Sequence, residues 1–295
     1  MKEKKDYIVR GIDKENNFRF FGANTRNMVN LACQKHHTAP VASAALGRTL
    51  TANAMMGAML KGSKDRVSLQ IKGDGPLGGI VTEANGMGEV KGYVYNPNVE
   101  THINHVGHLD VGGAVGNASL TVVKDLGLKE PYIGQVPMFT GEIAEDLTYY
   151  FAASEQTPSA VILGVLVDTD LSIRQAGGII IQVLPDADDD AITKLENNIK
   201  EFGDLTARLE KGQSIEYLIE TLLGAVEYMD TSDVNFVCDC SKERMERALI
   251  SVGKDELNAI IEEDHQAEVV CPFCNDKYTF SEQELVELRD KAISK

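Results

Sequence analysis

The residues best suited to chemistry are four cysteines near the C-terminal end of the chain. Cys238 and Cys240 form one close pair, and Cys271 and Cys274 form a second, out of five cysteines in the sequence. Two pairs of thiols separated by a helix-length insert can surround one soft tetrahedral cation, for which Zn²⁺ is the usual choice. The sequence therefore predicts a site in which these four residues hold one Zn²⁺.

The residues around the second pair favour a metal-binding turn. Residues 269–270 are apolar and predict a strand that leads into the pair, and Asn275 tolerates the positive φ of a tight turn. Tyr278 and Phe280 can then cover the metal as the chain returns. This pattern resembles a zinc-ribbon knuckle more than a redox Cys-x-x-Cys at a helix start. The one-residue gap of the first pair is unusually tight, but an extended backbone lets both thiolates reach one metal. The alternative is four unrelated buried cysteines.

Four thiolates would fill the coordination sphere of Zn²⁺ and leave no position for water or substrate. The site is then structural, or it is regulated through its own ligands. Oxidation to disulfides would consume the ligands and release the metal, and with it most of the stability of a small module. Four cations near the cysteines in sequence are expected to favour their thiolates: Lys242, Arg244, Arg247 and Lys277.

Composition and charge exclude several classes of function. The chain has 295 residues, is 43% hydrophobic and carries a formal net charge of −16, which argues against nucleic acid because phosphate binding needs a basic face. Residues 231–295 contain 8 Lys and Arg against 15 Asp and Glu, so their formal charge is −7. No apolar run approaches the ~20 residues that cross a bilayer. The charged N-terminus shows no signal peptide, so we expect a cytoplasmic protein with reduced thiols.

The first 185 residues predict an α+β core with antiparallel sheet, because hairpin-linked strands outnumber helices. Thr38 is expected to cap a long helix that has Pro40 in its first turn and ends near residue 60. The remaining predicted elements are a helix over residues 25–33, a helix over 142–154, and strands over 7–12, 18–22, 66–84 (a hairpin), 89–95, 118–124, 161–167 and 177–185.

Other chemically capable residues fit structural roles better. Three histidines spaced three apart could share a helix face and bind a metal, but neighbouring glycines break any helix. A glycine-rich segment lacks the ending of a phosphate-binding loop and is followed by a strand. The remaining cysteine has apolar neighbours, and three methionines suit core gaps better than an adaptable binding surface. These are, in order, His102, His105 and His108; residues 73–79; Cys33; and Met55, Met56 and Met59.

Beyond residue 185 the composition becomes more charged, with apolar residues at helical spacing in residues 192–202 and 215–226. Helices with one apolar stripe need a surface to lie on, so residues 186–232 are expected to be a docked amphipathic linker. The predicted division is a core of residues 1–185, this helical linker, and a small zinc-binding module of residues 233–295. The module is expected to contain two helices after Ser241 and a last helix that starts at the capping box Ser281–Glu284.

Three features together resemble one protein family over essentially the whole chain. They are the Cys-x-Cys and Cys-x-x-Cys tail, the Ile-Lys-Gly-Asp-Gly-Pro-Leu-Gly turn of residues 71–78, and the Ala-Gly-Gly of residues 176–178 running to Leu184-Pro185. The chain resembles the redox-regulated heat-shock holdases, the 33 kDa chaperonin family. The cysteine spacing is the most specific part of the resemblance.

The resemblance implies an ATP-independent chaperone, not an enzyme, that is inactive when reduced and zinc-bound. It implies oxidation to two disulfides, Cys238–Cys240 and Cys271–Cys274, with zinc release and unfolding of the switch. It also implies unfolding proteins as clients, a dimer as the active form and a cytoplasmic location, with no nucleic acid or membrane partner. Spacing alone leaves three disulfide connectivities open. Two other functions compete: a thiol-disulfide oxidoreductase using Cys271 and Cys274, and an adaptor whose zinc site is purely structural.

Overall fold

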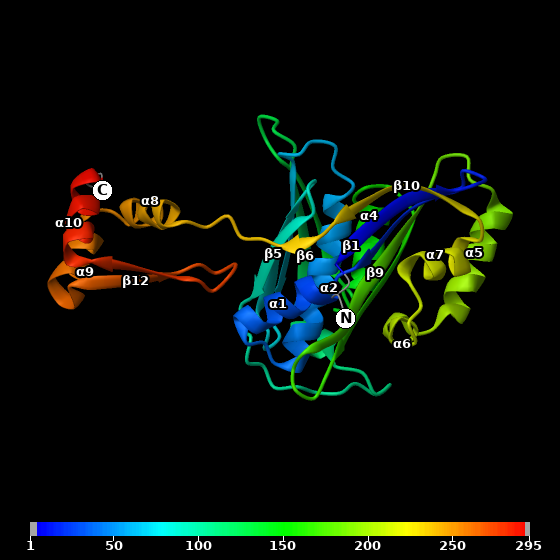
Figure 1. The fold of residues 1–295 in the computed structure, drawn as a ribbon, viewed down its shortest axis with the longest axis horizontal. Coiled ribbons are helices and arrows are strands. Elements are labelled where there is room, and N and C mark those ends of the chain that lie inside the picture. The colour runs from blue at the N-terminus through cyan, green and yellow to red at the C-terminus, as the bar shows by residue number, and fades with distance from the viewer. Residues whose placement is uncertain (1–4, 293–295) are drawn as a thin grey trace. The chain divides into compact units, whose positions relative to one another are not determined.

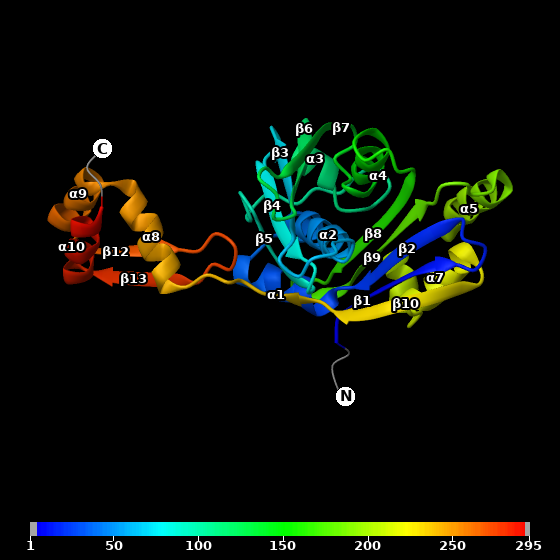
Figure 2. The ribbon, with the colours of Figure 1, turned by 90° about the horizontal axis from the view of Figure 1, so that it is seen from above.

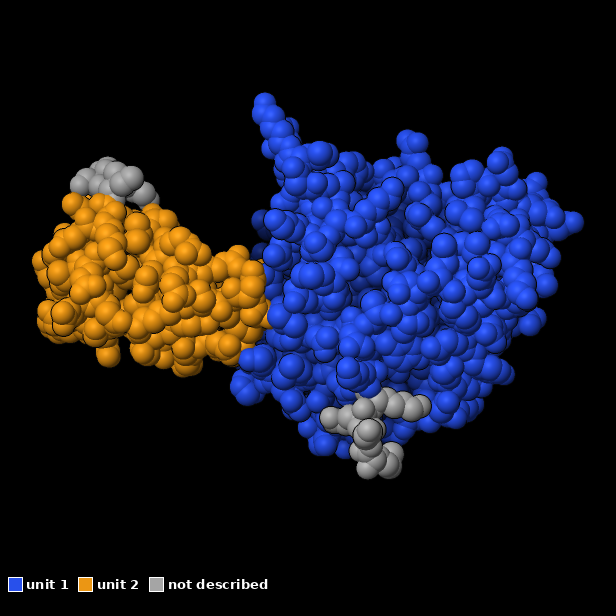
Figure 3. Space-filling view, turned by 45° about the horizontal axis from the view of Figure 1, so that its top comes forward, with its two compact units in different colours: residues 1–237 blue, residues 238–295 orange. Residues whose placement is uncertain are grey.

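The computed structural model describes residues 5–292 and divides the chain into two compact units (Figure 3). Residues 1–237 form the first, here called the sheet unit, and residues 238–295 form the second, the cysteine unit. The helices predicted as a linker belong to the sheet unit. Each unit is described by itself below.

The sheet unit contains two β-sheets (Figure 1). In the first, an antiparallel sheet of five strands, the order is β10 (Val226–Asp233), β1 (Tyr7–Asp13), β2 (Phe18–Asn24), β9 (Ile173–Val183) and β8 (Ser159–Val167). In the second, of six strands, it is β11 (Asn235–Phe236), β5 (Glu89–Val94), β4 (Gly79–Asn85), β3 (Arg66–Gly73), β6 (Ala118–Asp125) and β7 (Tyr132–Met138). Only the short β11–β5 pair is parallel among these strands, so the predicted α+β class with antiparallel sheet is confirmed.

Helix α2 (Pro40–Gly57) packs against strands of both sheets and runs between them (Figure 2). Its many alanines and glycines let neighbouring strands approach closely, and nearly every residue of the helix is buried. Met55 and Met56 are fully buried, which confirms that these methionines fill the core. The predicted cap is wrong: Ala39 precedes the helix, and the Thr38 hydroxyl instead bonds to Ser43 Oγ at 2.6 Å.

The other helices around this core are α1 (Arg26–His36), α3 (Val111–Val115) and α4 (Ala144–Ala153). The glycine-rich residues 73–79 join β3 to β4 as a turn, as predicted. Strand β8, predicted over residues 161–167, lies at the edge of its sheet, and most of its side chains are half-exposed.

The apolar stripes of the charged segment lie on the outer face of the five-stranded sheet. The outer helices are α5 (Asp189–Phe202), α6 (Leu205–Glu210) and α7 (Ile215–Leu223), and the side chains of Asp188, Asp204 and Ser214 cap them. Successive strand residues face opposite sides of a sheet, so β2 presents one set of side chains to α2 and another to these helices. A second apolar core results, made by Val9, Phe18, Phe20, Ile179, Ile181, Leu195, Phe202, Leu205, Leu209, Ile215, Leu218, Ile219 and Leu222.

Residues 226–233 depart from the predicted helical linker, because they form the edge strand β10 that pairs with β1. Val226 was grouped with the apolar stripe of the preceding helix, but Gly224 ends α7 with a φ of 79° and turns the chain into the strand. Side chains of β10 are mostly exposed, so its sequence carries no apolar alternation.

The cysteine unit is a small hairpin packed by three helices. Its elements are α8 (Lys242–Val252), α9 (Lys254–Asp264), β12 (Gln266–Val270), β13 (Lys277–Ser281) and α10 (Glu282–Lys291). Ser241 caps α8, and Ser281 and Glu284 form the predicted capping box of α10. The core of the unit is small and is made by Met245, Leu249, Leu257, Ile261, Phe280, Leu285 and Leu288.

Candidate metal centre

The sulfur atoms of Cys238, Cys240, Cys271 and Cys274 all lie within 4.8 Å of one another. Cys238 Sγ is 3.7 Å from Cys271 Sγ, and Cys240 Sγ is 3.3 Å from Cys274 Sγ. Four sulfurs at the corners of a tetrahedron around Zn²⁺, with Zn–S bonds of about 2.3 Å, would be about 3.8 Å apart. In residues 5–292 this is the group of His, Cys, Asp and Glu side chains that can hold a metal ion, and its thiolate donors suit zinc.

Different local structures position the two cysteine pairs. Cys238 and Cys240 lie on the non-helical segment directly before α8, where Ser241 has extended backbone and starts the helix with its side chain. Cys271 and Cys274 lie in the turn between β12 and β13. The segment before a helix and the end of a hairpin therefore supply two sulfurs each.

The turn that carries the second pair closes tightly on itself. The amide of Asn275 donates to the carbonyl of Cys271 at 2.8 Å, and the amide of Cys271 donates to the carbonyl of Asp276 at 2.9 Å. Asn275 has a φ of 62°, as predicted for a residue that tolerates the left-handed region. A hairpin turn at this pair differs from the helix N-terminus that lowers a thiol pKa in Cys-x-x-Cys oxidoreductases.

Hydrogen bonds make the thiols unequal. Burial raises the pKa of Cys238 to about 11 and also raises the pKa of Cys274, although backbone amides of Cys240 and Asp276 act against these shifts. Burial opposes ionisation of Cys240 too, but hydrogen bonds from the Tyr278 hydroxyl and the neighbouring thiols outweigh it and lower the pKa of Cys240. The Tyr278 Oη to Cys240 Sγ distance is 3.1 Å. Of these three thiols, Cys240 therefore ionises most readily without a metal.

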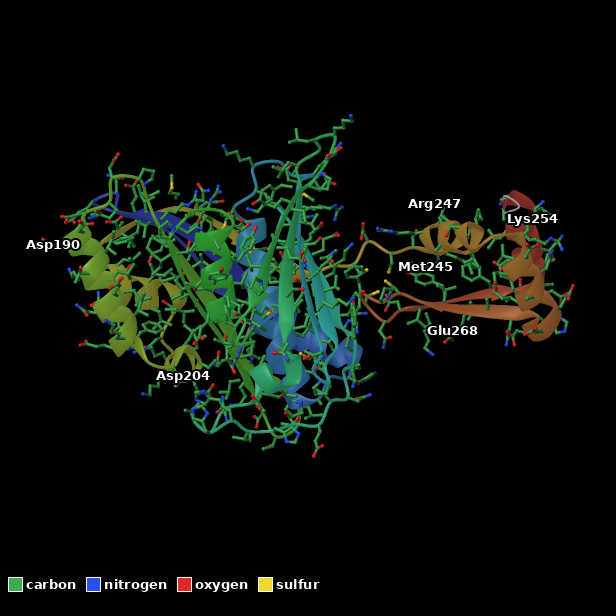
Figure 4. All side chains as sticks on the ribbon, turned by 180° about the vertical axis from the view of Figure 1, so that it is seen from behind. Asp190, Asp204, Met245, Arg247, Lys254 and Glu268 are labelled. Atoms are coloured by element: carbon green, nitrogen blue, oxygen red, sulfur yellow. The ribbon has the colours of Figure 1, made fainter. Side chains whose placement is uncertain are left out.

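The cations expected to favour thiolates are largely engaged elsewhere. Burial and hydrogen bonds are the main causes of the thiol pKa shifts, so the predicted role of these cations is not supported. Arg247 is exposed on α8, whereas Met245 on the same helix is buried (Figure 4). The ion pairs are Lys242–Glu284 at 2.5 Å, Arg244–Asp239 at 2.8 Å and Lys277–Glu268 at 2.9 Å.

The other candidate groups have structural positions in the part of the chain that the structure describes. His105 and His108 lie in the loop that the Ile103–Leu109 bridge closes, and His102 lies just before it; within residues 5–292 the three histidines do not form a group that can hold a metal. Cys33 is buried in the core of the sheet unit. None of the helices in the described residues combines the length and the apolar character needed to cross a bilayer.

Comparison with known proteins agrees with this fold. The sequence pattern of the family described as "Hsp33 protein" matches residues 6–281. The "33 kDa chaperonin" of Alkaliphilus oremlandii is 52% identical, with 99% of this chain and 98% of that protein covered. The "33 kDa chaperonin" of Bacillus subtilis is 49% identical, with 97% and 99% covered. The crystal structure of the 33 kDa chaperonin (heat shock protein 33 homologue) from Thermotoga maritima superposes with a TM-score of 0.92 at 37% identity, covering 98% of this chain and 99% of that one. This chain therefore belongs to the Hsp33 protein family.

Proposed function

We propose that this chain is a redox-regulated, ATP-independent chaperone that holds unfolding proteins under oxidative stress. The observation that carries the proposal is the cluster of four thiols in a small unit of a chain that belongs to the Hsp33 family. In the reduced, inactive form, Cys238, Cys240, Cys271 and Cys274 would hold one Zn²⁺. A closed set of four ligands leaves no open position, so we assign no catalytic residue.

The metal would account for most of the stability of the cysteine unit. The unit has about sixty residues, too few for one apolar core to give more than a few kcal/mol. Structural zinc contributes about 10–16 kcal/mol of apparent binding free energy, and that energy is available only to the folded unit. Loss of the metal should therefore unfold the cysteine unit.

Oxidation would remove the ligands. Two thiols become one disulfide as they give two electrons to the oxidant, and one molecule of hydrogen peroxide is thereby reduced to two waters. We propose the pairs Cys238–Cys240 and Cys271–Cys274, the first of which closes a small ring and should be easily reduced. In the reduced cluster, sulfur contacts of 3.7 Å and 3.3 Å join Cys238 to Cys271 and Cys240 to Cys274, so the proposed disulfides would exchange these contacts between the pairs for bonds within each pair.

The outer helices would supply the surface for clients. Their apolar side chains are buried against the five-stranded sheet, and each contributes about 1.5–3 kcal/mol to docking. We propose the functional division predicted above: residues 1–185 as core, 186–232 as a releasable linker, and 233–295 as the switch. Released helices and the uncovered sheet would both expose apolar surface, which binds apolar segments of unfolding proteins. We further propose a homodimeric active form and a cytoplasmic location.

The decisive experiment compares suppression of client aggregation by the reduced zinc-loaded protein and by peroxide-treated protein under mild heat. Oxidised protein is expected to suppress aggregation and to have released its zinc. The variant Cys33→Ala, which changes the cysteine outside the cluster, should behave like the wild type, whereas Cys271→Ser should fail to retain zinc. Equal protection by the reduced and oxidised wild type would contradict the proposal.

Two alternatives predict different measurements. A thiol-disulfide oxidoreductase should reduce insulin with rapid turnover when zinc is removed, but Cys271 is buried and the pair lies on a hairpin turn. An adaptor with a purely structural site should keep its zinc at peroxide concentrations that oxidise ordinary exposed thiols.

A further inference from the structure

One hydroxyl group in the cysteine unit contacts a sulfur of the metal cluster. Tyr278 on β13 donates from its Oη to Cys240 Sγ at 3.1 Å. The thiols of Cys238 and Cys274 instead receive hydrogen bonds from the backbone amides of Cys240 and Asp276. Tyr278 therefore supplies to Cys240 the hydrogen-bond donor that backbone amides supply to Cys238 and Cys274. Unlike a backbone amide, this side-chain donor can be removed by substitution.

We infer that Tyr278 is a positioning residue that holds Cys240 as a metal-bound thiolate and so sets how readily the centre loses its metal to an oxidant. This inference rests on the proposed metal site and adds a residue outside the four ligands. A donor to a thiolate draws electron density from the sulfur, which stabilises the anion and makes it a poorer nucleophile toward peroxide. The hydroxyl would thus slow the attack of Cys240 on peroxide.

The strand that carries Tyr278 is built to hold the hydroxyl in place. Tyr278 pairs with Val269 across the β12–β13 hairpin. Two residues further on, Phe280 is only 1% exposed and anchors the strand in the core of the unit. Thr279, between them, lies on the opposite face of the strand and is exposed, so its hydroxyl provides a matched control.

Cys238 offers an internal comparison within the same cluster. Cys238 and Cys240 are both half-buried, whereas Cys271 and Cys274 are buried. Each of the first two sulfurs also has one donor from outside the thiol cluster: a backbone amide for Cys238, which no side-chain substitution removes, and the Tyr278 hydroxyl for Cys240. In the zinc-loaded protein, loss of the Tyr278 hydroxyl should therefore raise the alkylation rate of Cys240 relative to that of Cys238.

The test uses full-length Tyr278→Phe and Thr279→Val beside the wild type. Zinc affinity is measured by competition with a chelator, and zinc release is followed during peroxide treatment. Co²⁺ is also bound in place of zinc, because its sulfur-to-metal charge-transfer bands report the electron density on the thiolates. Alkylation of each cysteine is followed by mass spectrometry.

Tyr278→Phe is expected to bind zinc about 10-fold more weakly, the lower end of the usual cost of losing an outer hydrogen-bond partner of a metal ligand. Zinc should leave faster under peroxide, and the Co²⁺ bands should move to longer wavelength. Alkylation of Cys240 should become faster relative to that of Cys238, which keeps its backbone donor. Thr279→Val should match the wild type in every measurement.

Unchanged affinity and unchanged Co²⁺ bands in Tyr278→Phe would overturn the inference, as would an equal loss in Thr279→Val. If Tyr278→Phe does not fold with metal, site-specific 3-fluorotyrosine at position 278 replaces it. Its more acidic hydroxyl must move the bands to shorter wavelength, and no movement overturns the inference. A wild type that holds no tetrahedral Co²⁺ refutes the metal site itself, and with it the proposed function.

Discussion

Gly22 on β2 lies beneath helix α7 and gives a direct way to test whether release of the outer helices activates the chaperone. A Cβ atom at this position would lie 2.5 Å from Ile215 Cγ2 and 2.6 Å from Ile219 Cδ1, closer than carbon atoms approach. Ile219 Cδ1 is a terminal methyl that can rotate away, but Ile215 Cγ2 sits on a stiff β-branched carbon. The substitution Gly22→Ala should therefore push the start of α7 away from the sheet. The thiol cluster belongs to the other unit and is not touched by this change.

The expected magnitude follows from the cost of an overpacked contact, about 1–3 kcal/mol. If that cost falls on α7, the equilibrium between docked and released helix shifts by roughly 5- to 150-fold toward release. Reduced, zinc-loaded Gly22→Ala should then suppress client aggregation at a lower temperature than the wild type, with unchanged zinc content. Amides of Ile215–Leu223 should exchange with solvent correspondingly faster.

Thr221→Ala is the matched control, because Thr221 lies on the exposed side of the same helix. A surface change of this kind usually alters stability by no more than about 0.5 kcal/mol, so the control should behave like the wild type. Unchanged amide exchange in Gly22→Ala would refute the tight packing of α7 on β2. Faster exchange without activity in the reduced protein would refute the idea that helix release creates the client surface.

Three further outcomes test other parts of the structure. Phe280→Ala should cost the zinc-loaded cysteine unit about 3–5 kcal/mol, measured by thermal unfolding. Burial raises the pKa of Asp6 from 3.8 to about 6, so the ionised carboxylate weakens the fold. As the pH rises from 3.8 to 6, the free energy of unfolding of the wild type should therefore fall by up to about 3 kcal/mol relative to that of Asp6→Asn. The hydrogen bond from Lys242 lowers the pKa of Glu284 from 4.5 to about 2. The wild type should therefore be more stable than Glu284→Gln above pH 4.5, and this difference should decline as the pH falls toward 2. Unfolding of the cysteine unit measures it.

Elements with strong local signals were predictable from the sequence. The capping box at Ser281, the left-handed turn residue Asn275 and the four-cysteine cluster each depend on residue types at short spacing, and each is confirmed. The strands β7 and β10 were missed because they are sheet edges with many exposed side chains, so their sequences lack clear alternation. Only pairing with β6 and β1 makes them strands.

Long-range contacts were also beyond local reasoning. The apolar stripes of the outer helices were visible, but the surface that receives them was not, because it is assembled from β1, β2 and β9, far apart in sequence. At the cluster, the sequence predicted that Tyr278 lies beside the cysteines, but its hydrogen bond to Cys240 depends on the register of a hairpin. The prediction that nearby cations stabilise the thiolates failed for the same reason, because Lys242, Arg244 and Lys277 form ion pairs with carboxylates.

The segment that precedes Cys238 offers a path by which the proposed change at the four cysteines would reach the outer helices. Strand β10 joins the five-stranded sheet, and the amide of Val234 then donates to the carbonyl of Asp6. Strand β11 joins the six-stranded sheet, and Val237, immediately before the first ligand, donates to Val90. Residues 226–237 are weakly held on the two sheets, because β11 has only two residues and β10 is an edge strand with mostly exposed side chains. The Tyr228 hydroxyl ties β10 to α7 through the carbonyl of Glu216 at 3.2 Å. If unfolding of the cysteine unit pulled residues 226–237 away from the two sheets, the disturbance would reach α7 through β10. Gly22→Ala acts on α7 from the underlying sheet. Both changes should therefore release the same helix.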